Sequence, residues 1–369
     1  MNGAESLVQT LLDGGVDVCF TNPGTSEMHF CAALDRIDGM HCILCLFEGV
    51  VTGAADGYGR MLDRPAATLL HLGPGLGNGL ANLHNAKKAR TPIVNIVGEH
   101  ATYHIEYDAP LTADIEGIAH PVSDWVRTST DSARVASDAA CAIAASRASP
   151  GAVATLVLPA DTAWGSSNGA AKTVSPSTAT APDSSAVDEC ARALRSGEPA
   201  MLLLGGRALR SVPLETAGRI AAGTGAELRS ELMAARTERG SGRVSIERIP
   251  YPVDQAVGVL ENVRHLILVG TVSPVAFFAY PDKPSLLAPS DCQIHSLAGP
   301  ADDLLAALEW LADELGVSGV VPKLQAAQRP GLVSGALTVE SIGSAIGHLL
   351  PENAIICDES VTSGRGLHP

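Results

Sequence analysis

The chain has 369 residues, 46% of them hydrophobic and 18% charged, a composition typical of globular proteins with a large apolar interior and not of disordered ones. Its net charge of -15 and its low aromatic content of 4% argue against nucleic-acid and anionic-membrane partners. No stretch approaches the roughly 20 apolar residues of a membrane span, and acidic Glu5 and Asp13 argue against a signal peptide, so we expect a cytoplasmic protein.

Strand and helix patterns alternate along the first part of the chain. A helix is predicted over 5–13 and ends at Gly14 and Gly15. Short apolar runs that are typical of strands follow it along the chain. The predicted strands are 16–21, 43–47, 66–71, 92–98, 125–129 and 153–158, and the later helices are 49–55, 79–88 and 133–145. This alternation predicts a parallel sheet covered by helices.

A second unit follows a stretch that is rich in Ser, Thr, Ala and Pro and has no period. Its predicted helices are 187–196, 214–222 and 302–311, and its predicted strands are 199–204, 266–269 and 293–296. After another linker, a helix over 339–350 leads to a strand over 354–357. Gly205 and Gly206 after the strand 199–204 leave a bound flavin or nucleotide open in this unit.

We therefore predict an α/β fold with two doubly wound parallel-sheet domains and the beginning of a third. The expected divisions are a first domain, a linker, a central domain, a second linker and the start of a domain whose remainder is missing from this chain: 1–160, 161–184, 185–312, 313–337 and 338–369. The last segment is too short to bury a core of its own.

Polar residues follow three of the predicted strands in the first domain. They are the turn 22–27, Glu48 after the apolar run 43–47, which looks like an inner strand, and His71 after the third strand. Carboxyl ends of parallel strands meet at one edge of the sheet, so these residues should converge on one crevice. A lone Glu in a first helical turn or a lone His is more often structural, and it is the convergence that indicates a site.

Other local patterns carry weaker signals. The segment 73–78 reads as a glycine-rich turn before a helix, but its G-x-G-x-G spacing is not the dinucleotide fingerprint. Cys42/Cys45 and His100/His104 lack the partners of a transition-metal site, so we expect none within this chain. The eight cysteines should be free, buried thiols in a reducing compartment.

Taken together, the motifs N-P-G-T-S-E, F-E-G-V-V-T-G-A-A-D-G-Y-G-R and H-L-G-P-G-L-G-N-G resemble thiamine diphosphate-dependent enzymes of the acetolactate synthase and benzoylformate decarboxylase family. The resemblance runs over the whole chain, with the first domain similar to the pyrimidine-binding domain and 338–369 similar to the start of the diphosphate-binding domain. It implies thiamine diphosphate as cofactor, a 2-oxo acid as substrate, and a homodimer or homotetramer.

The resemblance also implies roles for individual residues. Glu48 is similar to the carboxylate that hydrogen-bonds the aminopyrimidine ring and so lets its amine remove the thiazolium C2 proton. His71 resembles the active-site histidine of the decarboxylase branch. With Glu48, the expected cofactor-binding residues are Asn22, Pro23, Gly24, Thr25, Gly73, Gly75 and Asn78.

Two departures leave the reaction type open between decarboxylase and carboligase. The segment 109–112 replaces the A-F-Q-E run of acetolactate synthases, with Leu111 in place of the glutamine, and Ala279 falls where the decarboxylase has its second histidine. A non-catalytic or regulatory paralogue that keeps the fold as an oligomeric scaffold is the alternative, and an NAD-linked oxidoreductase is a distant third.

The family holds Mg²⁺ and the diphosphate through a G-D-G motif in its third domain, and no G-D-G occurs in these 369 residues. Mg²⁺ needs hard oxygen ligands in octahedral geometry. We therefore expect the Mg²⁺ ligands to lie in the missing third domain, and the 369-residue chain alone to be inactive and unable to bind the whole cofactor.

Overall fold

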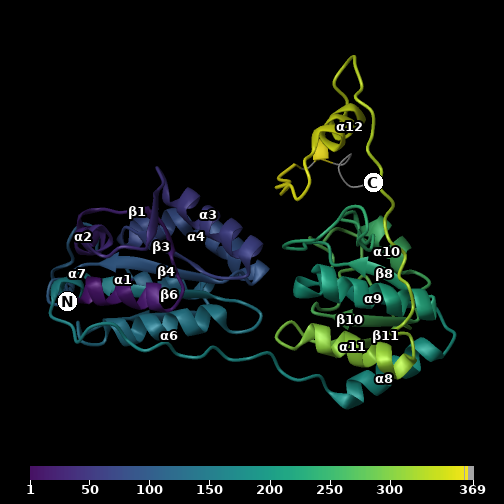
Figure 1. Cartoon of the computed structure of the whole chain (residues 1–369), viewed down its shortest axis with the longest axis horizontal. Coiled ribbons are helices and arrows are strands. Elements are labelled where there is room, and N and C mark those ends of the chain that lie inside the picture. The colour runs from purple at the N-terminus through teal and green to yellow at the C-terminus, as the bar shows by residue number, and fades with distance from the viewer. Residues whose placement is uncertain (361, 365–369) are drawn as a thin grey trace. The chain divides into compact units, whose positions relative to one another are not determined.

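The computed structural model describes residues 1–360 and 362–364. The chain divides into one unit formed by Met1–Glu238 with Ile246–Pro322 and another formed by Arg239–Ser245 with Lys323–Pro369. The first unit contains two parallel sheets, each with its own helices (Figure 1).

The first sheet has six strands in the order β2-β1-β3-β4-β6-β5, and every neighbouring pair is parallel. The strands are β1 (Val18–Asn22), β2 (His41–Leu44), β3 (Ala66–Leu70), β4 (Ile93–Glu99), β5 (Trp125–Thr128) and β6 (Val153–Pro159). From β1 the chain runs out to the edge strand β2 and then returns to β3 on the other side of β1. The switch point of the sheet therefore lies between the carboxyl ends of β1 and β3, where open α/β sheets hold ligands.

Helices cover both faces of this sheet, which explains why β3, β4 and β6 are buried along their whole length. Side chains alternate along β4, so that Val94 and Ile96 join the apolar cluster of one face and Ile93 and Val97 that of the other. The elements of the first face are α1 (Gly3–Asp13), α2 (Met28–Arg36), α6 (Val135–Arg147) and α7 (Ala160–Trp164). The helices of the other face are α3 (Glu48–Leu62), α4 (Leu72–Ala89) and α5 (Ile115–Ala119).

The second sheet has the parallel order β11-β10-β7-β8-β9. Its strands are β7 (Ala200–Leu204), β8 (Glu227–Ser230), β9 (Glu247–Arg248), β10 (His265–Val269) and β11 (Gln293–Ala298). The accompanying helices are α8 (Ser184–Arg195), α9 (Ser211–Thr224), α10 (Val253–Leu260) and α11 (Leu304–Leu315). Four short 3₁₀ turns complete the first unit: η1 (Thr25–Glu27), η2 (Ile105–Tyr107), η3 (His120–Val122) and η4 (Gly206–Leu209).

The other unit contains α12 (Val339–Leu349), which begins after Thr338 with a capping box formed by Thr338 and Ser341. An isolated bridge pairs Val244 with Leu324 within the same unit. Within the described residues, none of the helices combines the length and the apolar character that crossing a membrane requires.

The predicted α/β class with two parallel-sheet domains is confirmed, but the run 43–47 is not an inner strand. β2 ends at Leu44 and lies at the sheet edge, and Leu46 and Phe47 are 94% and 49% exposed. The apolar composition of this run could not distinguish a buried inner strand from an edge strand whose apolar side chains face outward.

The glycine-rich segment 73–78 is not a turn, because α4 already begins at Leu72. The N–H of Gly75 donates to the carbonyl of His71 at 2.7 Å, so helical bonding starts directly after β3. Neither Thr25 nor Ser26 caps a helix with its side chain, since Gly24 and Glu27 hold the cap positions.

Further details differ from the sequence-based expectation. The segment 354–357 is not a strand, and α7 occupies the first residues of the segment 161–184, which was expected to be a linker. The prediction also missed β8, β9 and α10, which lie between 222 and 266. All eight cysteines are free, but only Cys19, Cys45 and Cys190 are buried.

Candidate active site at the β1/β3 switch point

The residues after β1, β2 and β3 converge at the switch point, as the sequence predicts. Gly75, in the first turn of α4, lies between Glu48 and His71. A Cβ added to Gly75 would lie 3.0 Å from Oε1 of Glu48 and 3.3 Å from Cβ of His71. Glu48 and His71 therefore approach the same helical turn, and the missing side chain of Gly75 keeps a cradle beside the Glu48 carboxylate.

Glu48 is the first residue of α3 and is only 8% exposed. Nδ2 of Asn78 donates to its Oε2 at 3.0 Å, the one side-chain hydrogen bond that Glu48 makes within the described residues. The start of a helix carries partial positive charge, which stabilises a carboxylate there. A buried carboxylate with a single side-chain partner keeps acceptor capacity for a ligand.

Small residues bring α3 close to α4 and so fix the direction of Glu48. A Cβ on Gly79 would lie 2.8 Å from Cγ2 of Thr52, and one on Gly53 would lie 2.9 Å from Nδ2 of Asn82. The hydroxyl of Thr52 donates to the carbonyl of Gly79 at 3.0 Å across the two helices. The small residues that follow Glu48 in the sequence thus serve helix packing.

His71 is held by Glu27, a residue that sequence reasoning missed. Nδ1 of His71 lies 2.8 Å from Oε2 of Glu27, and this carboxylate also accepts the N–H of Gly24 at 2.7 Å and the hydroxyl of Ser26 at 2.5 Å. Glu27 is 3% exposed, whereas the His71 side chain is 24% exposed. With its Nδ1–H directed at the carboxylate, His71 offers Nε2 to a ligand.

Two glycines make room for this pair. A Cβ on Gly98, at the end of β4, would lie 1.6 Å from Oε1 of Glu27. A Cβ on Gly24 would lie 2.3 Å from Nδ1 of the His71 ring. The position of the imidazole therefore depends on the ends of three neighbouring strands.

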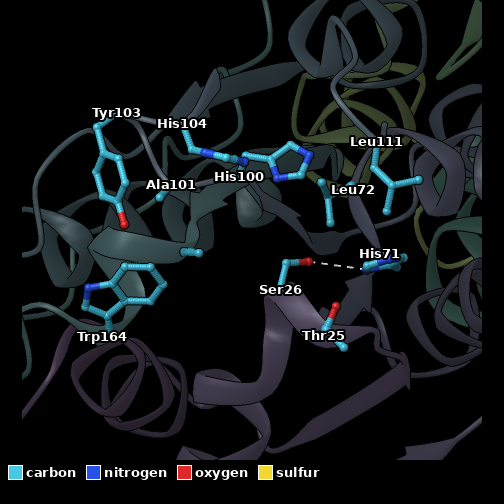
Figure 2. A pocket seen from close by; sticks show the side chains of 11 residues that line it. Thr25, Ser26, His71, Leu72, His100, Ala101, Tyr103, His104, Leu111 and Trp164 are labelled. Carbon is cyan, nitrogen blue, oxygen red and sulfur yellow. Dashed lines mark hydrogen bonds between the residues drawn. The ribbon is translucent and has the colours of Figure 1, made fainter. Parts of the chain in front are cut away.

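His71 opens onto a cavity of about 290 Å³, shown in Figure 2. Thr25 and Ser26 of η1 form the wall beside it, and Leu72 and Leu111 contribute apolar surface. The eleven lining residues include three histidines and no carboxylate. This composition contrasts with the net charge of -15 for the chain and favours an anionic ligand.

The other predicted site residues have different surroundings. Nδ2 of Asn22 donates to the carbonyl of Cys45 at 2.7 Å, which ties the end of β1 to the segment after β2. Pro23 is half-buried in the same turn. Gly73 packs against Ala113, whose Cβ would lie 2.5 Å from a Cβ at position 73. The cofactor contacts of these three residues stay predictions.

The two histidines of the H-x-x-x-H pair meet edge to face, with the ring centroids of His100 and His104 5.7 Å apart. Within the described residues, no three His, Cys, Asp or Glu side chains form a group that could hold a metal ion.

Glu99, the last residue of β4, gives the domain a testable pH dependence. It is 6% exposed, and burial raises its pKa from the ordinary value of 4.5, although its Oε1 accepts the N–H of His100 at 2.7 Å. The folded state then keeps a proton that the unfolded chain has lost. The free energy of unfolding should therefore fall as pH rises above 4.5 through the folded-state pKa, by at most about 1.4 kcal/mol per pH unit.

Urea unfolding at a series of pH values checks this expectation. The variant Glu99→Gln should lose that part of the pH dependence, and Glu106→Gln, at an exposed position nearby, should retain it. An unchanged pH slope in Glu99→Gln would contradict the assignment.

Comparison with known proteins places these residues in a wider context. Residues 1–121 match the family model described as thiamine pyrophosphate enzyme, N-terminal TPP binding domain. The chain is 54% identical over 366 residues to the IlvX protein of Mycobacterium tuberculosis, which is classed with acetolactate synthase large subunits. That match covers 99% of this chain and 70% of the relative.

A shorter match, 35% identical over 112 residues, links the chain to benzoylformate decarboxylase of Pseudomonas aeruginosa and covers 30% of this chain and 21% of that protein. Among solved structures, 4-hydroxybenzoylformate decarboxylase of Rhodococcus jostii aligns with a TM-score of 0.78 at 19% identity, covering 96% of this chain and 70% of that one. A thiamin diphosphate-dependent enzyme of Mycobacterium smegmatis aligns with a TM-score of 0.81 at 21% identity, with coverages of 96% and 71%. At these identities, the structural matches establish the fold.

Proposed function

The chain belongs to the thiamine diphosphate-dependent enzymes related to acetolactate synthase large subunits, and from this premise we propose that its β1/β3 crevice is the half-site for the cofactor pyrimidine in a 2-oxo acid decarboxylase or carboligase. The observation that carries the proposal is the buried Glu48 beside the Gly75 cradle, with His71 on the same helical turn.

The residues at the crevice fit the pyrimidine half of the cofactor. Glu48 would hold a proton at a ring nitrogen of the cofactor, Asn78 keeps the carboxylate in position, and Gly75, which lacks a Cβ, lets the carboxylate lie close to the first turn of α4. Thr25 lines the cavity beside His71, and Gly24 packs against the His71 ring. Asn22, Pro23 and Gly73 are kept as further cofactor-binding residues on the strength of the motif. Thiamine diphosphate, when bound, supplies the electron sink that decarboxylation of a 2-oxo acid requires.

The cavity beside His71 receives the substrate. Its histidines and hydroxyls, without a carboxylate in the wall, suit the negative charge of a 2-oxo acid. When the His71 ring holds a second proton, its Nε2–H would donate to the oxygen of the reacting carbonyl, and Glu27 stabilises the imidazolium.

Three wider features belong to the same proposal. Mg²⁺ is the proposed second cofactor, and it would be held by hard oxygen ligands. The protein forms a homodimer or homotetramer, which the exposed apolar side chains Leu44, Leu46 and Val50 around the start of α3 support. Its eight free cysteines support a cytoplasmic location.

An assay of CO₂ and aldehyde release tests the proposed function and distinguishes a decarboxylase from a carboligase. With thiamine diphosphate and Mg²⁺, the complete protein should release CO₂ from pyruvate or benzoylformate. Ala279 stands in place of a second histidine, so protonation of the product should be poor and free aldehyde should form slowly or not at all. Aldehyde formed as fast as CO₂ would contradict the carboligase branch. Absence of cofactor-dependent CO₂ release from any 2-oxo acid would contradict the function.

A further inference from the structure

A chain of four titratable side chains lies on the second sheet and takes no part in the proposed site. His265 of β10 and His295 of β11 are 5% and 7% exposed, and Nδ1 of the first lies 3.1 Å from Nε2 of the second. The other nitrogen of each ring meets a carboxylate. Nε2 of His265 lies 3.0 Å from Oε2 of Glu198, and Nδ1 of His295 lies 2.7 Å from Oε1 of Glu189. All four ring nitrogens therefore have a partner in the protein.

The fold brings these four residues together from four segments of the chain. β10 and β11 run parallel, and the register partner of His295 is Ile267, two residues beyond His265, so both imidazoles point to the same face of the sheet. Glu189 belongs to α8, which packs against β11 (Figure 1), and Glu198 lies just before β7. The contacts thus tie α8 and the segment before β7 to the two strands.

These contacts fix the number of protons on the two rings. The side chains of Glu189 and Glu198 are 53% and 57% exposed, and exposed carboxylates are ionised at neutral pH, so they only accept hydrogen bonds. Both outer ring nitrogens then carry a proton. The two inner nitrogens need one proton between them, because one must donate and the other must accept. Three protons on two imidazoles correspond to a single positive charge.

The other titratable groups of the surrounding elements leave this count unchanged. Burial and the charge of Glu189 raise the pKa of the Cys190 thiol in α8 to about 12, so this thiol is neutral. β7, on the other side of β10, consists of alanine, methionine and leucine. The arginines next to the four residues have other partners: Arg195 pairs with Glu314 of α11, and Arg264 pairs with Asp291. The remaining charged residues of α8 and α11 are exposed: Asp188, Arg192, Glu309 and Asp313.

Any change in the proton count breaks one of the contacts. A fourth proton would give two positive rings whose N–H groups face each other. Loss of the third proton would leave either a bare nitrogen against a carboxylate or two bare nitrogens facing each other. Groups of like charge, or two lone pairs, that face each other in a buried site repel. In either case the chain of contacts opens at one of its three links.

We propose that the His265–His295 pair is a pH switch, which holds one positive charge in the folded protein and keeps α8 tied to β10 and β11 only while it has that charge. The inference does not depend on the proposed function. In the unfolded chain the two histidines bind two extra protons in acid, none in base, and one in total near the ordinary imidazole value of about pH 6.5. Below that pH the unfolded chain binds more protons than the folded pair, and above it the folded pair binds more. The stabilisation from the pair should therefore be largest near pH 6.5 and decline on both sides.

Imidazole ¹⁵N NMR of the protein labelled with ¹⁵N-histidine counts the protons directly. Near pH 6.5, three of the four nitrogens of the pair should be protonated, with the signals assigned from the spectra of His265→Gln and His295→Gln. The count should rise to four in acid and fall to two in base. Two neutral rings or two charged rings at pH 6.5 would overturn the proposal.

Urea unfolding between pH 5 and 9 tests the link to stability. Relative to His265→Gln/His295→Gln, the urea midpoint of wild type should be raised most near pH 6.5. Glu99 titrates in both proteins, so its contribution cancels. Glu189→Gln/Glu198→Gln should lose the decline above pH 6.5, because an amide can donate to a bare ring nitrogen and a carboxylate cannot.

The matched control is His84→Gln, which changes an exposed histidine of α4 and should keep the wild-type pH profile. A difference between wild type and His265→Gln/His295→Gln that does not vary with pH would show that the pair is a fixed structural contact and not a switch. An alkaline decline that persists in Glu189→Gln/Glu198→Gln would also contradict the proposal.

Discussion

Glu48→Gln is expected to slow exchange of the C2 proton of bound thiamine diphosphate by about 10²- to 10⁴-fold, the range of general acid–base catalysis. The amide has nearly the size of the carboxylate and can still accept the hydrogen bond from Asn78, whose Nδ2 lies 3.0 Å from Oε2. The amide can donate a hydrogen bond, but it has no acidic proton to transfer to a ring nitrogen of the cofactor. The variant therefore removes the proton chemistry of Glu48 and leaves its packing in place.

The measurement is hydrogen–deuterium exchange at C2, followed by NMR on the complete protein loaded with thiamine diphosphate and Mg²⁺. Circular dichroism and thermal unfolding check that the fold is kept. Glu106→Gln changes an exposed glutamate of the same domain and should exchange at the wild-type rate. Exchange in Glu48→Gln within a few fold of wild type would show that Glu48 is not the activating carboxylate.

Periodicity was enough to predict the fold class and the convergence of the site. Alternation of strands and helices implies a parallel sheet, and a parallel sheet brings the carboxyl ends of its strands to one edge. For this reason Glu48, His71 and the turn 22–27 could be placed together before any contact was known.

The pairing of His71 with Glu27 could not be predicted in the same way. The two residues are 44 positions apart, and their contact depends on where β1 and β3 lie in the sheet. Glu27, the last residue of N-P-G-T-S-E, was the available signal for this pairing, but the sequence pattern assigned it to a turn. The edge position of β2 was missed for a related reason, because strand order depends on the whole sheet and not on the run 43–47.

The second sheet shows how a tertiary contact can change the meaning of a motif. Gly205 and Gly206 follow β7 at the switch point of that sheet, where a nucleotide phosphate would be expected. There Glu231 accepts the N–H of Gly206 at 3.0 Å and the hydroxyl of Thr271 at 2.7 Å. A carboxylate of the chain itself thus holds the place of an anion, and the glycines make room for it, since a Cβ on Gly205 would lie 2.5 Å from Glu231.

Gly98→Ala is expected to lower kcat/KM by about 100-fold, the size of effect expected when a catalytic group is misplaced by about 1 Å. The new methyl group would lie 1.6 Å from Oε1 of Glu27, so the buried carboxylate has to move away from His71. The free energy of unfolding should also fall by about 1–3 kcal/mol, as for other overpacked sites. Steady-state kinetics and urea unfolding measure the two effects.

Gly77→Ala is the matched control, because a Cβ at this exposed position of α4 meets nothing within 4 Å. Alanine favours a helix over glycine, so this variant should keep kcat/KM and gain up to about 1 kcal/mol of stability. If Gly98 acts through Glu27, the double variant Gly98→Ala/Glu27→Gln should be no slower than Glu27→Gln alone, since both changes remove the same pairing with His71. Additive losses, or wild-type kinetics in Gly98→Ala, would show that the orientation of His71 does not depend on Glu27.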